Sequence, residues 1–545
     1  MKQLKIVFIA GADTGIRGSI QHEDDFRYFE QGVLMTRPIM SEFFSQEGKF
    51  RDREALIART SSAPRRQIYF SGLFVYSLLT SKGYDVELIN CFVPGMSSLG
   101  EKLGVDIDAL CISTSFLTAE EVVLVVAEIK RINPEVPIFI GGRWVWNSYR
   151  VLMRQKSAPY AEDAVKQRYF FTMRHPPLGV SAYVVSPSGI PSLISVLEHI
   201  GEGKNWKDLP NLALPSPGEG FTFTQQRPDY LGVEDLSIDW TRIPRSLLSA
   251  VMPVSNSLGC PFRCRFCNFP SERHVRKPIS QLRKELRDLV DTHRFLNSIW
   301  FIDDNLLLNK KQVDEFCRMM REEELPVTWR SFIRADIIDM DVAEMLKTSG
   351  CELLIIGMES VNDHVLDAMG KNVKASQYTR TAKYLAEVGL SAELSFIIGF
   401  PGEDEKSLAQ LCDFLANYPA ASVPVATFLY LFVFHLEPLS EAFGEEFRKK
   451  WDLKGQHLSW RHRTMDVETA RKKLREVYLT ANSDRLMLNY LDCHPANLTE
   501  HELAIRRQRE RISKLIMLGD DVTEAKRELG RLVLSSGSQV RIKEQ

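Results

Sequence analysis

The chain has 545 residues, 44% of them hydrophobic and 26% charged, which suits a globular protein of about three domains. Its formal net charge of −2 offers no overall electrostatic attraction for nucleic acid or an anionic membrane. Nine cysteines are too few for a disulfide framework, so we expect a reducing, cytoplasmic location. The apolar run from Val425 to Phe434 falls far short of the ~20 residues that span a bilayer.

Residues 1–205 alternate short apolar runs with helical patterns, and this alternation predicts a doubly wound, Rossmann-like α/β domain with a parallel sheet. Amphipathic stretches such as Ala119–Ile132 separate the strands. A long charged insertion, Ser19–Arg66, follows the first strand and has no assigned role. The expected strands are Lys5–Ala10, Asp85–Cys91, Ala109–Ser113, Pro137–Ile140 and Ala182–Val185.

Residues 206–249 carry scattered prolines and glycines without a sustained period, which is typical of a linker. Residues 250–440 resume the alternation, and six strand–helix repeats predict an open, partial (β/α)6 barrel with its chemistry at the carboxyl ends of the strands. Residues 441–545 are predicted to form a helical C-terminal domain. The expected barrel strands are Pro253–Leu258, Ser298–Asp303, Val327–Arg334, Glu352–Gly357, Ala392–Ile398 and Val425–Leu431.

Three cysteines, Cys260, Cys264 and Cys267, follow the first barrel strand with the spacing C-x3-C-x2-C. Three thiolates on one short loop can hold three irons of a [4Fe–4S] cluster and leave the fourth iron open to a chelating substrate. A structural zinc site is the alternative, but zinc usually takes four ligands, and the nearby fourth donor is His274. Three unrelated buried thiols are a second alternative.

This arrangement resembles the radical S-adenosylmethionine (SAM) superfamily over most of residues 250–440. The resemblance implies that the backbone and carboxylate of Gly357, Met358 and Glu359, after the fourth strand, hold the SAM amino group. It also implies SAM contacts for Arg334, for the loop Gly399–Glu403 and for Phe266 near the adenine. Asp304 is a further SAM or substrate candidate.

Each of these positions also has a purely structural interpretation. Arg334 can form a surface ion pair, and Phe266 can pack in the core. Gly399–Glu403 can form a tight turn without any ligand, and the Asp303–Asn305 segment can cap the following helix. The functional interpretation therefore depends on their position, because each falls at the predicted carboxyl end of a barrel strand.

A doubly wound domain ahead of such a barrel resembles the cobalamin-binding subclass of the superfamily. The resemblance implies that a corrin approaches the small residues after the third and fourth strands. The segment Asp13–Gly18 has no histidine, so the lower face of the cobalt is left to Arg143 or Trp144. A Rossmann-like domain that binds nothing is the alternative. The implied cobalamin contacts are Ser113, Thr114, Ser115, Gly141, Gly142 and Arg143.

Two histidines are candidate catalytic residues. His462 lies in Trp460–Asp466, before a predicted helix, and it can act as a general acid or base or bind a substrate anion. A packed loop capped by Thr464 or Asp466 is the stronger alternative. His435, with Glu437, comes just after the sixth strand at the barrel mouth.

The resemblance implies methyl transfer from methylcobalamin to an unactivated carbon, or a phosphinate phosphorus, of a small-molecule or natural-product substrate through a 5′-deoxyadenosyl radical. It also implies an electron donor such as flavodoxin or ferredoxin, while the neutral-to-acidic charge balance of the chain disfavours a nucleic-acid partner. Cobalamin-dependent rearrangement or cyclisation is the alternative reaction. A tRNA methylthiotransferase fits less well, because Cys91 and Cys111 lie in apolar strand contexts. A non-catalytic iron–sulfur or cobalamin sensor would need no SAM pocket.

Overall fold

The computed structural model divides the chain into two compact units, which we describe separately. The first unit contains the described residues up to Pro261 together with 274–299, and the second contains 262–268 and the described residues from Trp300 onward. In the part of the chain that is described, no helix is long and apolar enough to cross a membrane. The described residues are 3–12, 68–93, 99–104, 106–157, 168–216, 220–268, 274–421, 423, 425–488 and 498–535.

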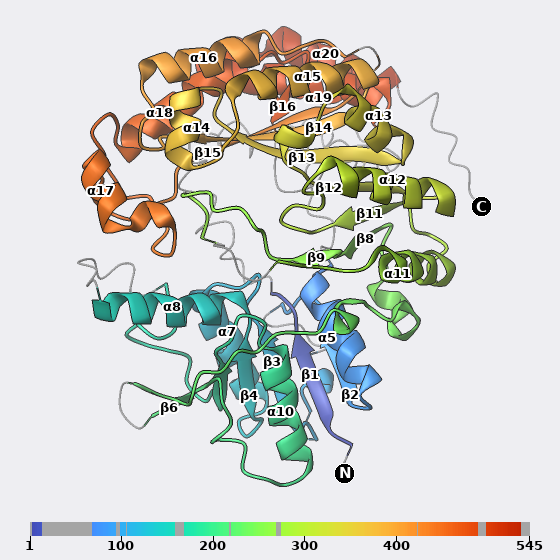
Figure 1. The fold of residues 1–545 in the computed structure, drawn as a ribbon, viewed down its shortest axis with the longest axis vertical. Coiled ribbons are helices and arrows are strands. Elements are labelled where there is room, and N and C mark those ends of the chain that lie inside the picture. Colours follow the sequence, from blue (N-terminus) through green and yellow to red (C-terminus); the bar gives the residue numbers. More distant parts are fainter. Residues whose placement is uncertain are drawn as a thin grey trace. The chain divides into compact units, whose positions relative to one another are not determined.

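The first unit is built on a seven-stranded sheet (Figure 1). The five expected strands pair in parallel in the order β2-β1-β3-β4-β5, which confirms the doubly wound fold class. The order of the strands in the sheet reverses direction between β1 and β3. In such sheets, ligands bind beyond the carboxyl ends of the strands at this switch point. The strands are β1 (Lys5–Ile9), β2 (Asp85–Ile89), β3 (Ala109–Ser113), β4 (Ile138–Gly141) and β5 (Ala182–Val184).

Helices connect these strands, and α7 shows why the sequence folds this way. Thr118 caps α7, since its hydroxyl accepts from the Glu121 backbone amide while the Glu121 carboxylate accepts from the Thr118 amide. One face of α7 then buries Val122, Val125 and Ile129 in the core of the unit. The helices are α5 (Phe70–Ser81), α6 (Leu99–Lys102), α7 (Ala119–Ile132), α8 (Arg143–Ser157) and α10 (Ile190–Gly201).

Part of the segment that was expected to be a linker is regular structure. Strands β6 (Leu212–Pro215) and β7 (Phe221–Phe223) form an antiparallel extension of the first sheet, beyond β5. Their buried residues, Leu212 and Ala213, are too few to give a period that sequence analysis can detect. Short 3-10 helices follow at Glu234–Leu236, Trp240–Arg242 and Arg245–Leu247.

A buried ion pair fixes the segment around α11 (Ile279–Thr292). The Lys277 Nζ atom lies 2.5 Å from a Glu285 carboxylate oxygen, and each side chain is 1% exposed. Lys277 also donates to the Ser255 carbonyl, and Glu285 accepts from the Ile238 amide. These extra bonds satisfy the two charges, which burial alone would destabilise strongly.

The second sheet has the order β16-β15-β14-β13-β12-β11-β8, and the consecutive pairs from β12 to β16 are parallel. This is the expected partial barrel, with one addition. The short β16 (Met487–Leu488) comes from the region that was expected to be helical. The other strands are β8 (Val251–Val254), β11 (Ser298–Phe301), β12 (Thr328–Phe332), β13 (Cys351–Glu359), β14 (Ser391–Ile398) and β15 (Thr427–Val433).

Helices alternate with these strands and continue after them (Figure 1). Several are capped by the residue that precedes them, as Asn309 caps α12 and Asp404 caps α16. The segment between β15 and α18 carries α17, whose Phe447 packs against Phe400, just after β14. The helices are α12 (Lys310–Glu323), α13 (Met340–Thr348), α14 (Asp363–Met369), α15 (Ala375–Val388), α16 (Glu405–Ala416), α17 (Glu445–Trp451), α18 (Val467–Thr480), α19 (Glu500–Leu518) and α20 (Thr523–Ser535).

Candidate active site

The three cysteines follow the short strand β9 (Ser257–Leu258), and their surroundings differ from those of the core cysteines. Cys260, Cys264 and Cys267 are all partly exposed and not disulfide-bonded. Burial raises the pKa of the core thiol Cys111 to about 12 and that of Cys317 to about 11, which makes both poor ligands. The partial exposure of the motif cysteines therefore disfavours the interpretation as three buried structural thiols.

The loop that carries Cys264 and Cys267 is held by backbone bonds. The Cys267 amide donates to the Cys264 carbonyl, and the Arg265 amide donates to the carbonyl of Met369 at the end of α14. Arg265 also forms an ion pair with Glu441, with 2.9 Å between Nε and Oε1. Cluster ligands must be held at fixed spacing, and these bonds provide it for this half of the motif.

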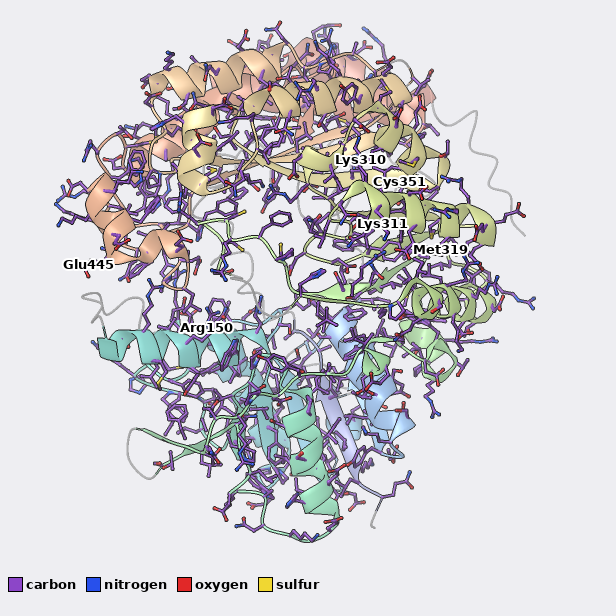
Figure 2. All side chains as sticks on the ribbon, viewed as in Figure 1. Arg150, Lys310, Lys311, Met319, Cys351 and Glu445 are labelled. Carbon is purple, nitrogen blue, oxygen red and sulfur yellow. The ribbon has the colours of Figure 1, made fainter. Side chains whose placement is uncertain are left out.

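The end of β13 is bent at the Gly357–Glu359 motif. The pairing of β13 with β14 shifts register between Gly357 and Glu359, and Glu359 has a left-handed backbone with φ of 64°. Such a bulge next to a site re-aims a side chain. A Cβ atom at Gly357 would meet the Glu359 carboxylate and lie 3.1 Å from Lys371 Nζ, so a larger residue here would force the carboxylate to shift. Cys351, labelled in Figure 2, marks the opposite end of β13.

The Glu359 carboxylate meets a lysine that sequence analysis did not identify. The Lys371 Nζ atom lies 3.0 Å from Glu359 Oε1, and both side chains are less than one-tenth exposed. Burial lowers the pKa of Lys371, but negative charges led by Glu359 and including Cys264 outweigh burial and raise that pKa above the ordinary lysine value. The motif carboxylate and the Phe266 ring of the cysteine loop therefore contact the same cation.

Arg334 lies against the same loop. Its guanidinium carbon is 3.9 Å from the centre of the Phe262 ring, and it donates to the Asp336 carboxylate and to the Lys371 carbonyl. Burial lowers the pKa of Arg334, but the Asp336 carboxylate and Cys264 outweigh that effect and raise it. Arg334 is therefore largely buried and holds the cysteine loop, rather than forming the surface ion pair of the alternative interpretation.

Phe266 and the end of β11 complete this group. Phe266 lies edge-to-face with Phe400 and 5.8 Å from Lys371 Nζ. After β11, Asp304 is exposed, whereas Asn305 is 3% exposed. Neither polar atom of the Asn305 amide has a hydrogen-bond partner among the described residues. A buried side-chain amide without hydrogen-bond partners destabilises the fold, and a polar ligand at this edge would supply the missing hydrogen bonds.

The Gly399–Glu403 loop and His462 are packed together beside this edge. The Glu403 carboxylate accepts from the Gly399 amide at 2.5 Å, and burial raises the Glu403 pKa to about 8. His462 is 8% exposed, stacks on Trp460, and has one ring nitrogen 3.0 Å from the Gly399 carbonyl and the other 3.2 Å from Thr464. Both ring nitrogens are thus occupied, which favours the packed-loop interpretation of His462.

His435 lies close to Glu437 and to His457, and the sequence analysis did not identify His457. His435, Glu437 and His457 bring their ligand atoms within 4.8 Å of one another, the one trio of potential metal ligands that meets this limit in the described part of the chain. Burial alone raises the pKa of Glu437, but His457 and His435 outweigh it and hold the carboxyl pKa well below its usual value. His457 lies 20 residues from Glu437 in the sequence, so no short sequence motif contains both residues.

In the first unit, the predicted corrin contacts after β3 and β4 touch one another. The Thr114 amide and hydroxyl both donate to the Gly141 carbonyl, at 2.8 Å each. Gly142 has a φ of 100°, and a Cβ atom there would lie 2.9 Å from the Thr114 amide nitrogen. Ser115 is exposed beyond them, Ser113 is buried, and Arg143 begins α8. The loop Asp13–Gly18, which has no histidine, lies outside the described residues, as does the rest of the segment 13–67.

Trp144, one of the two residues expected near the lower face of the cobalt, is engaged with the protein. Its indole nitrogen donates to the Arg168 carbonyl at 2.7 Å, and its ring stacks on Tyr169 with centroids 5.4 Å apart. Arg143 remains half-buried at the same turn.

Comparison with known proteins identifies relatives of the region that contains the cysteine loop. The model of the Radical SAM superfamily matches residues 255–415. An uncharacterized methyltransferase of Pyrococcus horikoshii is 24% identical over 349 residues, which are 62% of this chain and 71% of that protein. The bacteriochlorophyllide d C-12(1)-methyltransferase of Chlorobaculum tepidum is 30% identical over 177 residues, but these are only 31% of this chain and 38% of that protein.

Two solved structures share the fold over nearly the whole chain. The radical SAM methyltransferase TsrM from Kitasatospora setae, with cobalamin and a [4Fe–4S] cluster bound, aligns with 99% of this chain and 100% of its own, at a TM-score of 0.59 and 12% identity. The cobalamin-dependent radical enzyme OxsB, with aqua-cobalamin bound, aligns with 98% of this chain and 76% of its own, at 0.57 and 12%. The chain therefore contains a radical SAM domain at residues 255–415, within a fold that it shares with cobalamin-dependent radical SAM enzymes.

Proposed function

We propose that this protein is a cobalamin-dependent radical SAM methyltransferase that acts on a small molecule. The observation that carries the proposal is the group at the cysteine loop, where Arg334 stacks on Phe262 and Lys371, paired with Glu359, lies over the ring of Phe266. When bound, the cluster supplies the electron that cleaves SAM, and cobalamin carries the methyl group that is transferred.

The residues present fit a cluster and SAM. Three partly exposed thiols provide three ligands and leave one iron open. The second oxygen of the Glu359 carboxylate and the amide of Asn305 are proposed to bind the amino and carboxylate end of SAM. Phe266 is proposed to pack near the adenine. The cations Lys371 and Arg334 balance the negative charge that the thiolates and the cluster bring to a buried site.

The first unit fits cobalamin at the edge after β3 and β4. Ser113, Thr114, Ser115 and the glycines Gly141 and Gly142 leave the backbone there free of bulky side chains, which a flat macrocycle requires. This edge lies next to the switch point of the sheet, where ligands of doubly wound domains bind. Arg143 is proposed as the charged residue nearest to the ligand.

We infer the methyl acceptor from the type of reaction and not from the shape of a binding pocket. A carbon-centred radical is needed only when the methyl acceptor is not a nucleophile, so we propose an unactivated carbon or a phosphinate phosphorus as the acceptor. His435 is proposed to contact the substrate, because it follows β15 at the same edge of the sheet as Glu359. A low-potential donor such as flavodoxin or ferredoxin is proposed to reduce the cluster.

Anaerobic purification with cobalamin in the growth medium, followed by ultraviolet–visible and EPR spectra, tests this proposal. We expect about one cobalamin and one [4Fe–4S] cluster per chain, and release of 5′-deoxyadenosine from SAM under reductant. A protein that holds the cluster and cleaves SAM but does not retain cobalamin would refute the methyl-transfer proposal and leave a radical SAM enzyme of another reaction class. A protein that cleaves no SAM would refute both.

A further inference from the structure

Outside the cysteine loop, two histidines and one glutamate converge on a single point. The Nδ1 atom of His435 lies 3.7 Å from Glu437 Oε1, and the Nδ1 atom of His457 lies 3.6 Å from the same oxygen. Both separations exceed a normal hydrogen bond of 2.7–3.2 Å. They are close to the separation of about 3.3–3.6 Å between two ligands that bind one ion at about 2.0–2.2 Å with tetrahedral geometry.

The backbone holds the three residues in register. His435 and Glu437 flank Leu436, and the Glu437 amide donates to the His435 carbonyl at 3.0 Å, so a tight three-residue turn keeps the two residues close. Leu436 pairs with His457 in an antiparallel bridge, with backbone bonds of 3.1 and 2.8 Å. In a regular ladder His457 would share the face of Leu436, away from Glu437. Its left-handed backbone, with φ of 46°, departs from that geometry, and its ring reaches Glu437.

The donor set is typical of transition-metal sites. Two imidazoles and one carboxylate bind zinc in catalytic sites that keep an open position, and the same set binds Fe²⁺ as a facial triad. The side chains of His435 and Glu437 are 26% and 20% exposed, whereas that of His457 is 6% exposed. The site is thus anchored on its buried side and accessible on the other. We propose that His435, Glu437 and His457 bind one divalent transition-metal ion with a coordination position open to a ligand.

This site is coupled to the cysteine loop through a short segment. Ala442, five residues after Glu437, donates its amide to the Arg265 carbonyl at 2.9 Å, and Glu441 pairs with the Arg265 side chain. Arg265 lies between Cys264 and Cys267 in the sequence. An ion here would bind an oxygen of a carboxylate, phosphate or phosphinate group on the substrate and so anchor it beside the cluster loop. That role rests on the proposed function, whereas the metal site itself does not.

The test measures metal binding rather than turnover. Holoprotein with its cluster loaded is dialysed against Zn²⁺, and zinc and iron per chain are counted by mass spectrometry. The variants are His457→Ala and Glu437→Gln, and the matched control is His175→Ala, which removes an exposed histidine of the first unit. We expect one zinc in the wild type and the control, and a loss of zinc affinity of more than about 100-fold in both site variants, since even outer-shell changes cost 10–100-fold.

Equal zinc content in all four proteins, or no zinc in the wild type, would overturn the proposal. Iron content is the internal reference, because it reports the cluster independently of the zinc. If the site variants do not fold, Co²⁺ bound to the wild-type holoprotein decides the matter. A visible spectrum without thiolate-to-cobalt charge transfer supports the His–Glu–His site, and a strong charge-transfer band assigns the ion to cysteine instead.

Discussion

Lys371 and Glu359 form a buried ion pair at the end of β13, with 3.0 Å between Nζ and Oε1. The pair links the strand-end motif to the cysteine loop, because the Lys371 Nζ atom also lies 5.8 Å from the centre of the Phe266 ring. The backbone carbonyl of Lys371 accepts a hydrogen bond from the Arg334 guanidinium. A change in this pair should therefore affect both the stability of the second unit and the binding of SAM.

Replacing Lys371 with Met tests this relationship. The variant leaves the Glu359 carboxylate buried without its partner, and breaking a buried pair in this way costs about 3–5 kcal/mol. Urea unfolding of the Lys371→Met protein should show that loss in the free energy of unfolding. The double variant with Glu359→Gln should recover part of it, because no uncompensated charge remains. A loss below about 1 kcal/mol in the single variant would show that the pair does not stabilise the fold.

Glu403 should make stability depend on pH. Burial raises its pKa to about 8, so as the pH rises from about 5 to 8 the unfolded chain loses a proton that the folded chain keeps. The folded state binds more protons in this range, and its stability therefore falls as pH rises, by up to about 1.4 kcal/mol per pH unit.

The variant Glu403→Gln removes this titration while its amide oxygen can still accept from the Gly399 amide. The free energy of unfolding, measured for both proteins from about pH 5 to 8, should decline more steeply in the wild type. Parallel curves for the two proteins would contradict a raised pKa for Glu403.

The Lys277–Glu285 pair should stabilise the first unit. Glu285→Gln leaves the Lys277 ammonium buried with the Ser255 carbonyl but without its carboxylate partner. We expect a loss of about 3–5 kcal/mol. Hydrogen exchange should place the loss in α11 and the segment around Ile238, which Glu285 also holds. The exposed variant Lys284→Gln, on the same helix, is the control and should change stability by less than about 1 kcal/mol.

Gly142 should be needed for cobalamin. An alanine Cβ at Gly142 would lie 2.9 Å from the Thr114 amide nitrogen, and the two loops would have to separate. The control is Gly83→Ala, since Gly83 also has a left-handed backbone, with φ of 88°, but no atom within 4 Å of the added Cβ. Gly142→Ala should be about 1–3 kcal/mol less stable than the control and should lose cobalamin absorbance on purification. Equal cobalamin content in the two variants would exclude this edge as the binding site.

Much of the fold is accessible from the sequence because it depends on local patterns. The strands of both sheets are short apolar runs between amphipathic helices, and strand alternation predicts the parallel order. The hairpin of β6 and β7 and the two-residue β16 were not predicted. Their pairing is decided by the sheet edge that they join, and so few residues carry no period of their own.

Some residues of the candidate site can be identified from the sequence, and others come together only in the fold. Cys260, Cys264 and Cys267 share one loop, so their spacing is visible in the sequence. Lys371 and His457 come close to Glu359 and Glu437 only through the fold, and neither stands in a motif. The contacts of His462 favour the packed-loop alternative, because both of its ring nitrogens contact the protein itself.

The central claim is that the three cysteines hold a cluster that cleaves SAM. It is tested most directly by iron content, EPR and 5′-deoxyadenosine production in the Cys264→Ala protein. Cys412→Ala, which removes another partly exposed thiol, is the matched control. The account predicts a full cluster and normal deoxyadenosine production in the control, and loss of both in Cys264→Ala. A complete, oxygen-sensitive cluster with undiminished deoxyadenosine production in Cys264→Ala would contradict it.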